Sequence, residues 1–96
     1  MYARVTNLRF PPAMRTQILG VAWGLVPVLE RQQGFRGLHI LTESDKGEGI
    51  LVSFWETEAN AQASETNASY IGQMSMMSSF LYEALTPQTY EADVLA

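Results

Sequence analysis

The sequence predicts an α+β domain in which strands and helices follow the order β-α-β-β-α-β, with helices on one face of a four-stranded antiparallel sheet. Three patterns carry this prediction: apolar residues spaced by three and four in residues 13–33, two strand-like runs flanking a short polar loop, and a strand-like segment near each end. The 96 residues suffice for one hydrophobic core, so we expect a single domain over residues 1–96.

The first half of the chain is predicted to form one strand and one helix. Residues 2–9 are rich in β-branched and aromatic side chains and are followed by a Pro-Pro pair, so we expect a strand there. The apolar residues of 13–33 form one face of a helix, and Gly34 is suited to its C-terminal cap. Pro27 has no N–H to donate to the carbonyl of Trp23, which predicts a kink within this helix.

Residues 35–43 and 49–56 are two β-rich runs, and the polar loop between them predicts a hairpin. We expect Gly47 to adopt left-handed backbone angles after a type I turn, which places Ser44 opposite Glu48. In this register the face toward the helices consists of Leu38, Ile40, Ile50, Val52 and Phe54. The other face holds Gly37, His39, Leu41, Leu51, Ser53 and Trp55, with His39 opposite Ser53. A shift of one residue would separate His39 from Trp55.

The second half of the chain is predicted to form two helices and a last strand. Thr57 is a favourable N-cap for a short helix that ends near Ser64. A longer helix over residues 67–85 carries a wide apolar stripe that includes three methionines and Tyr70. A Thr-Pro pair ends this helix, and residues 89–95 complete the sheet.

Composition excludes several classes of function. The net charge is −4 and the six Lys and Arg residues are scattered, which argues against a nucleic-acid partner. No cysteine is present, so neither a disulfide framework nor a thiolate site is possible. The most apolar run, residues 18–29, is 12 residues long, whereas a membrane span needs about 20. We find no signal segment and expect a cytoplasmic protein without membrane contact.

Four segments of the chain resemble a known family. They are residues 33–38 (QGFRGL), residues 50–59 (ILVSFWETEA), residues 2–6 (YARVT) and residues 88–94 (QTYEADV). In order and composition they resemble the antibiotic-biosynthesis-monooxygenase-like domains of the dimeric α+β barrel superfamily, and the resemblance covers nearly the whole chain. It implies a ferredoxin-like fold.

The resemblance also implies a homodimer, in which two sheets pair face to face and each chain encloses a pocket between its sheet and its own helices. The predicted sheet leads to the same expectation independently. Helices on one side only would leave Trp55, Leu41 and Leu51 in water, which a second copy would cover. A small apolar or aromatic molecule is the ligand that the resemblance implies.

Trp55 and His39 are the first candidates for the pocket, because the predicted register places them on one face. Trp55 ends a strand where the family often has an aromatic pocket wall; the alternative is that it fills the core or the dimer interface. His39 is the only histidine and therefore the only side chain expected to titrate near neutral pH, unless it is a hydrogen-bonded structural residue. A single histidine does not make a three-ligand zinc site, so we expect no metal.

The remaining candidates come from residue type. Family members that oxygenate aromatic polyketides without a cofactor use Trp, Asn, Tyr and Arg, which this chain can supply as Trp55, Asn7, Tyr70 and Arg4. Met74 and Met77 are predicted to cover the pocket or to fill the core. The haem-degrading relatives need Trp and His on the later helices, and both are missing there.

These observations lead to one main hypothesis and two alternatives. The main hypothesis is a monooxygenase that needs no cofactor and acts on a small aromatic or polyketide-like molecule. In it, His39 or Arg4 polarises or deprotonates a phenol, Trp55 forms the wall and Tyr70 orients the substrate. The alternatives are a binding or assembly module that performs no bond chemistry, and an isomerase of a lactone or enol that uses the same pocket.

Overall fold

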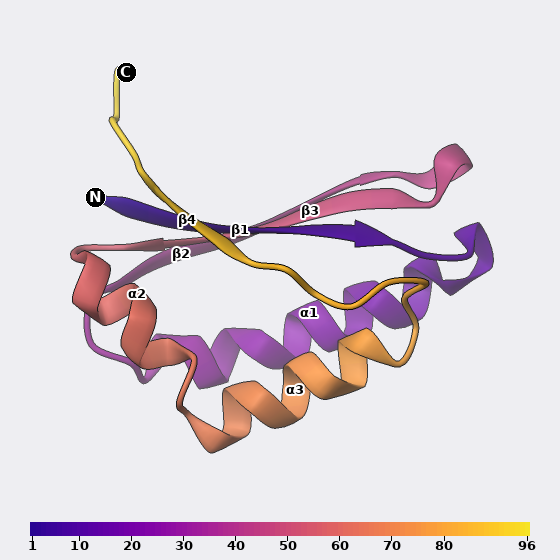
Figure 1. The fold of residues 1–96 in the computed structure, drawn as a ribbon, viewed down its shortest axis with the longest axis horizontal. Helices are drawn as coiled ribbons and strands as arrows, with labels where there is room; N and C mark the ends of the chain where they lie inside the picture. The colour runs from indigo at the N-terminus through magenta and orange to yellow at the C-terminus, as the bar shows by residue number, and fades with distance from the viewer.

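The computed structural model describes residues 1–96, apart from the side chain of Ser44. One antiparallel sheet has the strand order β2-β3-β1-β4, and all three α-helices cover the same face of it (Figure 1). The predicted order of strands and helices is confirmed. The elements are β1 (Tyr2–Arg9), α1 (Arg15–Glu30), β2 (Phe35–Glu43), β3 (Glu48–Trp55), α2 (Glu58–Ser64), α3 (Ala68–Ser78) and β4 (Gln88–Glu91), with 3-10 turns at Pro12–Met14 and Ser44–Lys46.

Local signals in the sequence account for the helix ends. The side chain of Thr57 accepts a 3.0 Å hydrogen bond from the backbone N–H of Asn60, as expected of an N-cap. Asn67 caps α3 in the same way, since its side chain accepts from the N–H of Tyr70 at 3.0 Å. Helix α1 is continuous through Pro27. None of the described helices is long and apolar enough to span a membrane.

The last helix in the structure is shorter than the one predicted from the apolar pattern over residues 67–85. Helix α3 ends at Ser78, and the chain then turns back toward β1, where the N–H of Tyr82 donates to the carbonyl of Arg9 at 2.9 Å. The apolar side chains beyond the helix still pack on the core, but from a loop. The apolar pattern therefore predicted the burial of Met74 and Met77 correctly, but Ile71 and Met76 are exposed, and the helix is shorter than predicted.

The hydrophobic core lies between the sheet and the helices. Trp55, at the end of β3, is completely buried, and its ring meets that of Phe35 edge-on with centroids 5.5 Å apart. Leu51 is buried on the same face. The expectation that Trp55 and Leu51 lie on the uncovered side of the sheet is wrong.

This error arises from the register of the hairpin. Glu43 pairs with Glu48, and His39 lies opposite Val52 rather than Ser53. The loop contains four residues instead of three, because a 3-10 turn precedes Gly47. A change of one residue exchanges the two faces of one strand relative to the other. The helix-covered face of the hairpin therefore holds Leu38, Ile40, Leu51, Ser53 and Trp55.

We call the side of the sheet opposite the helices the open face. Cross-strand pairing places the following residues on it: Ala3, Val5, Asn7, Gly37, His39, Leu41, Ile50, Val52, Phe54 and Tyr90. Leu41 is 55% exposed and Tyr90 52% exposed, so apolar side chains on this face are uncovered in a single chain. His39 and Phe54 touch edge-on, with ring centroids 5.8 Å apart.

The left-handed conformation predicted for Gly47 is confirmed, with φ of +64°. Its carbonyl accepts a 2.8 Å hydrogen bond from the N–H of Phe10, which joins the hairpin loop to the end of β1. A Cβ atom on Gly47 would lie 2.0 Å from the carbonyl oxygen of Phe10. Backbone conformation and contact thus both require glycine at this position.

Gly47→Ala is expected to lower the free energy of unfolding by about 2 kcal/mol or more, because it adds left-handed strain to a backbone clash. Gly20→Ala is the matched control: a Cβ on Gly20, in α1, meets no atom within 4 Å. It should stabilise the protein by about 0.5–1 kcal/mol. Urea denaturation measures both values, and equal effects of the two substitutions would contradict this account.

Candidate functional site

A small polar cavity lies inside the protein, between the sheet and the helices. Four apolar side chains, Leu25, Leu29, Leu38 and Leu51, form part of its wall, and the polar part consists of Arg4, Thr6, Ser53 and Tyr70. Its volume is about 10 Å³, at the lower limit of the space that can hold one water molecule. Strands β1, β2 and β3 contribute one side and helices α1 and α3 the other.

Arg4 brings a positive charge into this cavity. Its side chain is only 8% exposed, Nη1 donates to Oγ1 of Thr89 at 2.9 Å, and Nη2 forms an ion pair with Glu65. The Nε atom is buried and has no hydrogen-bond partner among the described residues. A guanidinium does not lose its proton in a protein, so Arg4 places a permanent cation with an unused donor beside the cavity.

Tyr70 approaches the same cavity from the first turn of α3, where the Asn67 cap holds the backbone. Burial raises the pKa of its phenol above the ordinary value of 10.0; the Arg4 charge opposes this rise, and the Glu65 charge adds to it. The phenol is therefore neutral at physiological pH and can both donate and accept a hydrogen bond. Since the pKa is raised in the folded state, the corresponding stability is present below pH 10 and is lost as the pH rises through the raised pKa.

The other residues expected at the pocket on the helix side belong to the core. The indole Nε1–H of Trp55 donates to Oγ of Ser53 at 2.9 Å, so Trp55 stands behind the cavity wall and orients one of its polar groups. Met74 and Met77 are buried in the cluster that joins α3 to α1 and the sheet. These three residues support the site from outside the cavity lining.

His39 and Asn7 lie on the open face, away from Arg4 and Tyr70. Both side chains are exposed. The prediction that His39 shares a face with Trp55 is wrong for the reason of register given above. Within one chain the structure brings together Arg4 and Tyr70 but not His39.

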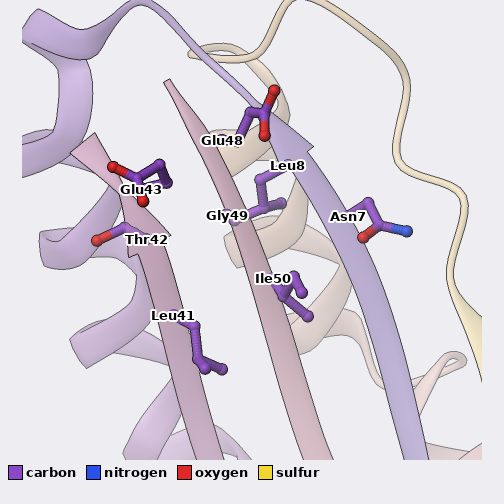
Figure 2. Close-up of a pocket in the computed structure, with 8 residues that line it drawn as sticks. All are labelled: Asn7, Leu8, Leu41, Thr42, Glu43, Glu48, Gly49 and Ile50. Atoms are coloured by element: carbon purple, nitrogen blue, oxygen red, sulfur yellow. The ribbon is translucent and has the colours of Figure 1, made fainter. Parts of the chain in front are cut away.

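Asn7 instead borders a wider hollow of about 390 Å³ at one end of the open face (Figure 2). Asn7, Ile50 and Leu41 form one row across β1, β3 and β2. The carboxylates of Glu43 and Glu48 lie at the end of this hollow (Figure 2). Among the described residues, no group of three His, Cys, Asp or Glu side chains is placed to bind a metal ion.

Sequence reasoning missed four polar residues that complete the site: Thr6, Ser53, Glu65 and Thr89. Thr6 could have been found, because alternation along a strand puts it on the same face as Arg4. Ser53 required the correct hairpin register. Glu65 and Thr89 are remote in sequence, and nothing in their local segments indicates a contact with Arg4.

The sheet order and the helices on one face define a ferredoxin-like α+β fold. The family model described as antibiotic biosynthesis monooxygenase matches residues 1–71, and this chain belongs to that family. No curated protein matches the sequence.

Several solved structures share the fold. Rv0793 from Mycobacterium tuberculosis superposes with a TM-score of 0.79 at 12% identity, covering 99% of this chain and 98% of that one. A conserved protein from Methanosarcina mazei Go1 gives 0.81 at 12% identity, with 97% and 94% covered. A variant of SnoaB, a cofactor-independent oxygenase from Streptomyces nogalater, gives 0.80 at 14% identity, with 98% and 95% covered. At these identities the likeness establishes a common fold.

Arg4→Met is expected to raise the pKa of Tyr70 further, because the substitution removes the positive charge that lowers it and leaves the Glu65 charge unbalanced. The ¹³Cζ shift of Tyr70, followed by NMR against pH, measures this change. Arg9→Met is the control, since Arg9 lies on the same strand as Arg4 but forms an exposed ion pair with Glu83. A pKa of Tyr70 that is the same in Arg4→Met and wild type would show that the two side chains are not electrostatically coupled.

Proposed function

We propose that this chain is a cytoplasmic, homodimeric monooxygenase that acts without a cofactor on a small aromatic or polyketide-like molecule, in the cavity beside Arg4 and Tyr70. The observation that carries the proposal is the buried Arg4 guanidinium, whose Nε has no hydrogen-bond partner among the described residues and which lines the same leucine-walled cavity as the neutral phenol of Tyr70. Family membership and the fold shared with a cofactor-independent oxygenase support the reaction class.

The chemistry requires a site that makes the substrate electron-rich. A phenol or enol bound with its oxygen at Arg4 ionises more readily, because the guanidinium stabilises the anion by charge-assisted hydrogen bonds. The anion reduces O₂ directly. Overall a ring CH₂ group and O₂ become a carbonyl group and water, so the substrate supplies all the electrons and one oxygen atom is retained.

Arg4 acts here as a stabilising cation and not as a base, because it keeps its proton. Tyr70 orients the substrate oxygen by a hydrogen bond. A ring needs more space than the cavity of about 10 Å³ provides, so the helices must shift outward when it binds. Met74 and Met77 in α3 suit this movement, since flexible thioether side chains repack easily.

Arg4→Lys is expected to lower turnover of anthrone-like substrates about 100-fold, because a lysine lacks the forked donors that stabilise the oxyanion. Tyr70→Phe should lower it about tenfold. Arg9→Lys, the same substitution at an exposed position of β1, should leave turnover unchanged. An oxygen electrode and product analysis measure these rates.

His39→Ala tests which face carries the reaction. We expect normal oxygen uptake from it, since His39 lies on the opposite side of the sheet from Arg4. Turnover that is abolished by His39→Ala and unaffected by Arg4→Lys would place the reaction on the open face and refute the proposed site.

The open face supports the homodimer. Val52, at the centre of this face, is flanked by Val5 on β1 and His39 on β2, and the more exposed Leu41 and Ile50 extend the apolar surface. A second copy placed sheet against sheet would cover these side chains, and a stable interface of this kind buries about 1,600 Å² in total. His39 and Asn7 then lie at the interface.

Val52→Glu is expected to convert the protein to a monomer, because it would bury two unpaired carboxylates in the interface. Gln17→Glu adds the same charge at an exposed position of α1 and should leave the dimer intact. Size-exclusion chromatography with light scattering gives the mass. A wild-type monomer, or a dimeric Val52→Glu protein, contradicts the proposed interface.

A binding module is the second candidate, and the contacts of Arg4 favour it. Thr89 and Glu65 already engage the guanidinium, so a ligand could stabilise the fold without any bond chemistry. Such a module would show thermal stabilisation by aromatic ligands without oxygen uptake. An isomerase of a lactone or enol would instead form product without consuming oxygen.

A further inference from the structure

We propose that Glu65 is a displaceable counter-ion of Arg4. The anionic oxygen of an aromatic ligand would replace the Glu65 carboxylate at the guanidinium, so the cavity selects aromatic ligands that carry such an oxygen. This inference builds on the proposed function, because it places the ligand in the same cavity, and it adds a specificity-determining residue and a ligand class.

The two partners of the ion pair differ strongly in their exposure to water. The side chain of Arg4 is 8% exposed, whereas that of Glu65 is 46% exposed. Glu65 is the C-cap of α2, in the short link that leads to α3. Its carboxylate can therefore turn into solvent at little cost, since it is already half hydrated. Arg4 cannot leave the interior and needs an anion whenever Glu65 departs.

The donors along one edge of the Arg4 guanidinium match an incoming carboxylate or phenolate. Nη1 is held by Thr89 on β4, while Nε has no partner among the described residues and Nη2 is bound only to Glu65. Nε and Nη2 lie on the same edge of the guanidinium, the edge that carboxylates engage with two parallel hydrogen bonds. A ligand that replaces Glu65 thus gains the Nη2 donor and also uses the one that is free.

Charge balance explains why a neutral analogue is disfavoured. With Glu65 in place one carboxylate balances the charge of the buried guanidinium, and an anionic ligand preserves this balance as Glu65 leaves. A neutral ligand must either leave the Arg4–Glu65 pair intact, and lose access to Nη2, or separate the pair and leave the guanidinium uncompensated. The leucine residues of the wall then favour an apolar ring attached to the anionic group.

The protonation of the Tyr70 phenol is compatible with the replacement of Glu65 by a ligand anion. Tyr70 senses both members of the pair, since the Arg4 charge lowers its pKa and the Glu65 charge raises it. A ligand anion at Arg4 replaces the charge of Glu65 and keeps Tyr70 protonated. The Tyr70 hydroxyl then remains a donor toward the ligand oxygen.

Benzoate and benzamide are the probes, because they have nearly the same shape and differ in charge. We expect Glu65→Gln to tighten benzoate binding about tenfold, because it removes the competing carboxylate, and to change benzamide binding less than twofold. Glu83→Gln is the matched control, since Glu83 forms the exposed ion pair with Arg9, and it should change neither affinity. Dissociation constants from NMR titration measure these effects, and the assigned Tyr70 signals show whether the ligand is in the cavity.

Three outcomes overturn the inference: benzoate affinity that is unchanged or weaker in Glu65→Gln, equal tightening of both ligands, or no benzoate binding to either protein. Glu65→Ala provides a second variant with the same expectation, and circular dichroism verifies the fold of each. These titrations are independent of turnover. Selective tightening without oxygen uptake would uphold the counter-ion and refute the oxygenase, whereas oxygen uptake with unaltered selectivity would do the reverse.

Discussion

The burial of the Arg4 guanidinium is the constraint on which the site depends. A permanent cation beneath the helices requires compensation from elements that are remote in sequence, and the fold supplies Thr89 from β4 and Glu65 from the α2–α3 link. One side chain on β1 therefore connects the last strand and the helical layer. The same requirement would make the proposed site selective, because any rearrangement that admits a ligand must keep an anion or a hydrogen-bond acceptor at this guanidinium.

The fold could be predicted because it depends on periodicity and local signals. The apolar spacing of α1, the Thr57 cap and the two strand-like runs around Gly47 are each readable within a short window, and the structure confirms them. Which residues of the hairpin point toward the helices could not be predicted in this way, because that depends on the length of one loop. A loop of three residues and a loop of four both accommodate a left-handed Gly47. The three-residue loop would place His39 on the same face of the sheet as Trp55, whereas the observed four-residue loop places it on the opposite face.

The composition of the site was only partly predictable for a related reason. Residue type singled out Arg4 and Tyr70, and both line the cavity. Their partners could not be inferred, because the contact between Arg4 and Thr89 joins residues 85 positions apart and exists only once β4 pairs with β1. The position of Trp55 at a strand end was compatible with two roles, a pocket wall or a residue of the core or interface. Its complete burial and its hydrogen bond to Ser53 show that it belongs to the core and contacts a residue that lines the cavity.

Strand β1 contributes residues to both the cavity and the open face, because alternate residues point to opposite faces. Arg4 and Thr6 enter the cavity, while Ala3, Val5 and Asn7 belong to the open face. A second copy on the open face would thus contact the same strand that holds the guanidinium, without touching the guanidinium itself. Such contact would restrain β1 but would not involve α3 or the α2–α3 link, which lie on the other side of the sheet (Figure 1). Dimerisation would thus constrain the sheet that holds Arg4, whereas the movement that a larger ligand requires would come from the helices.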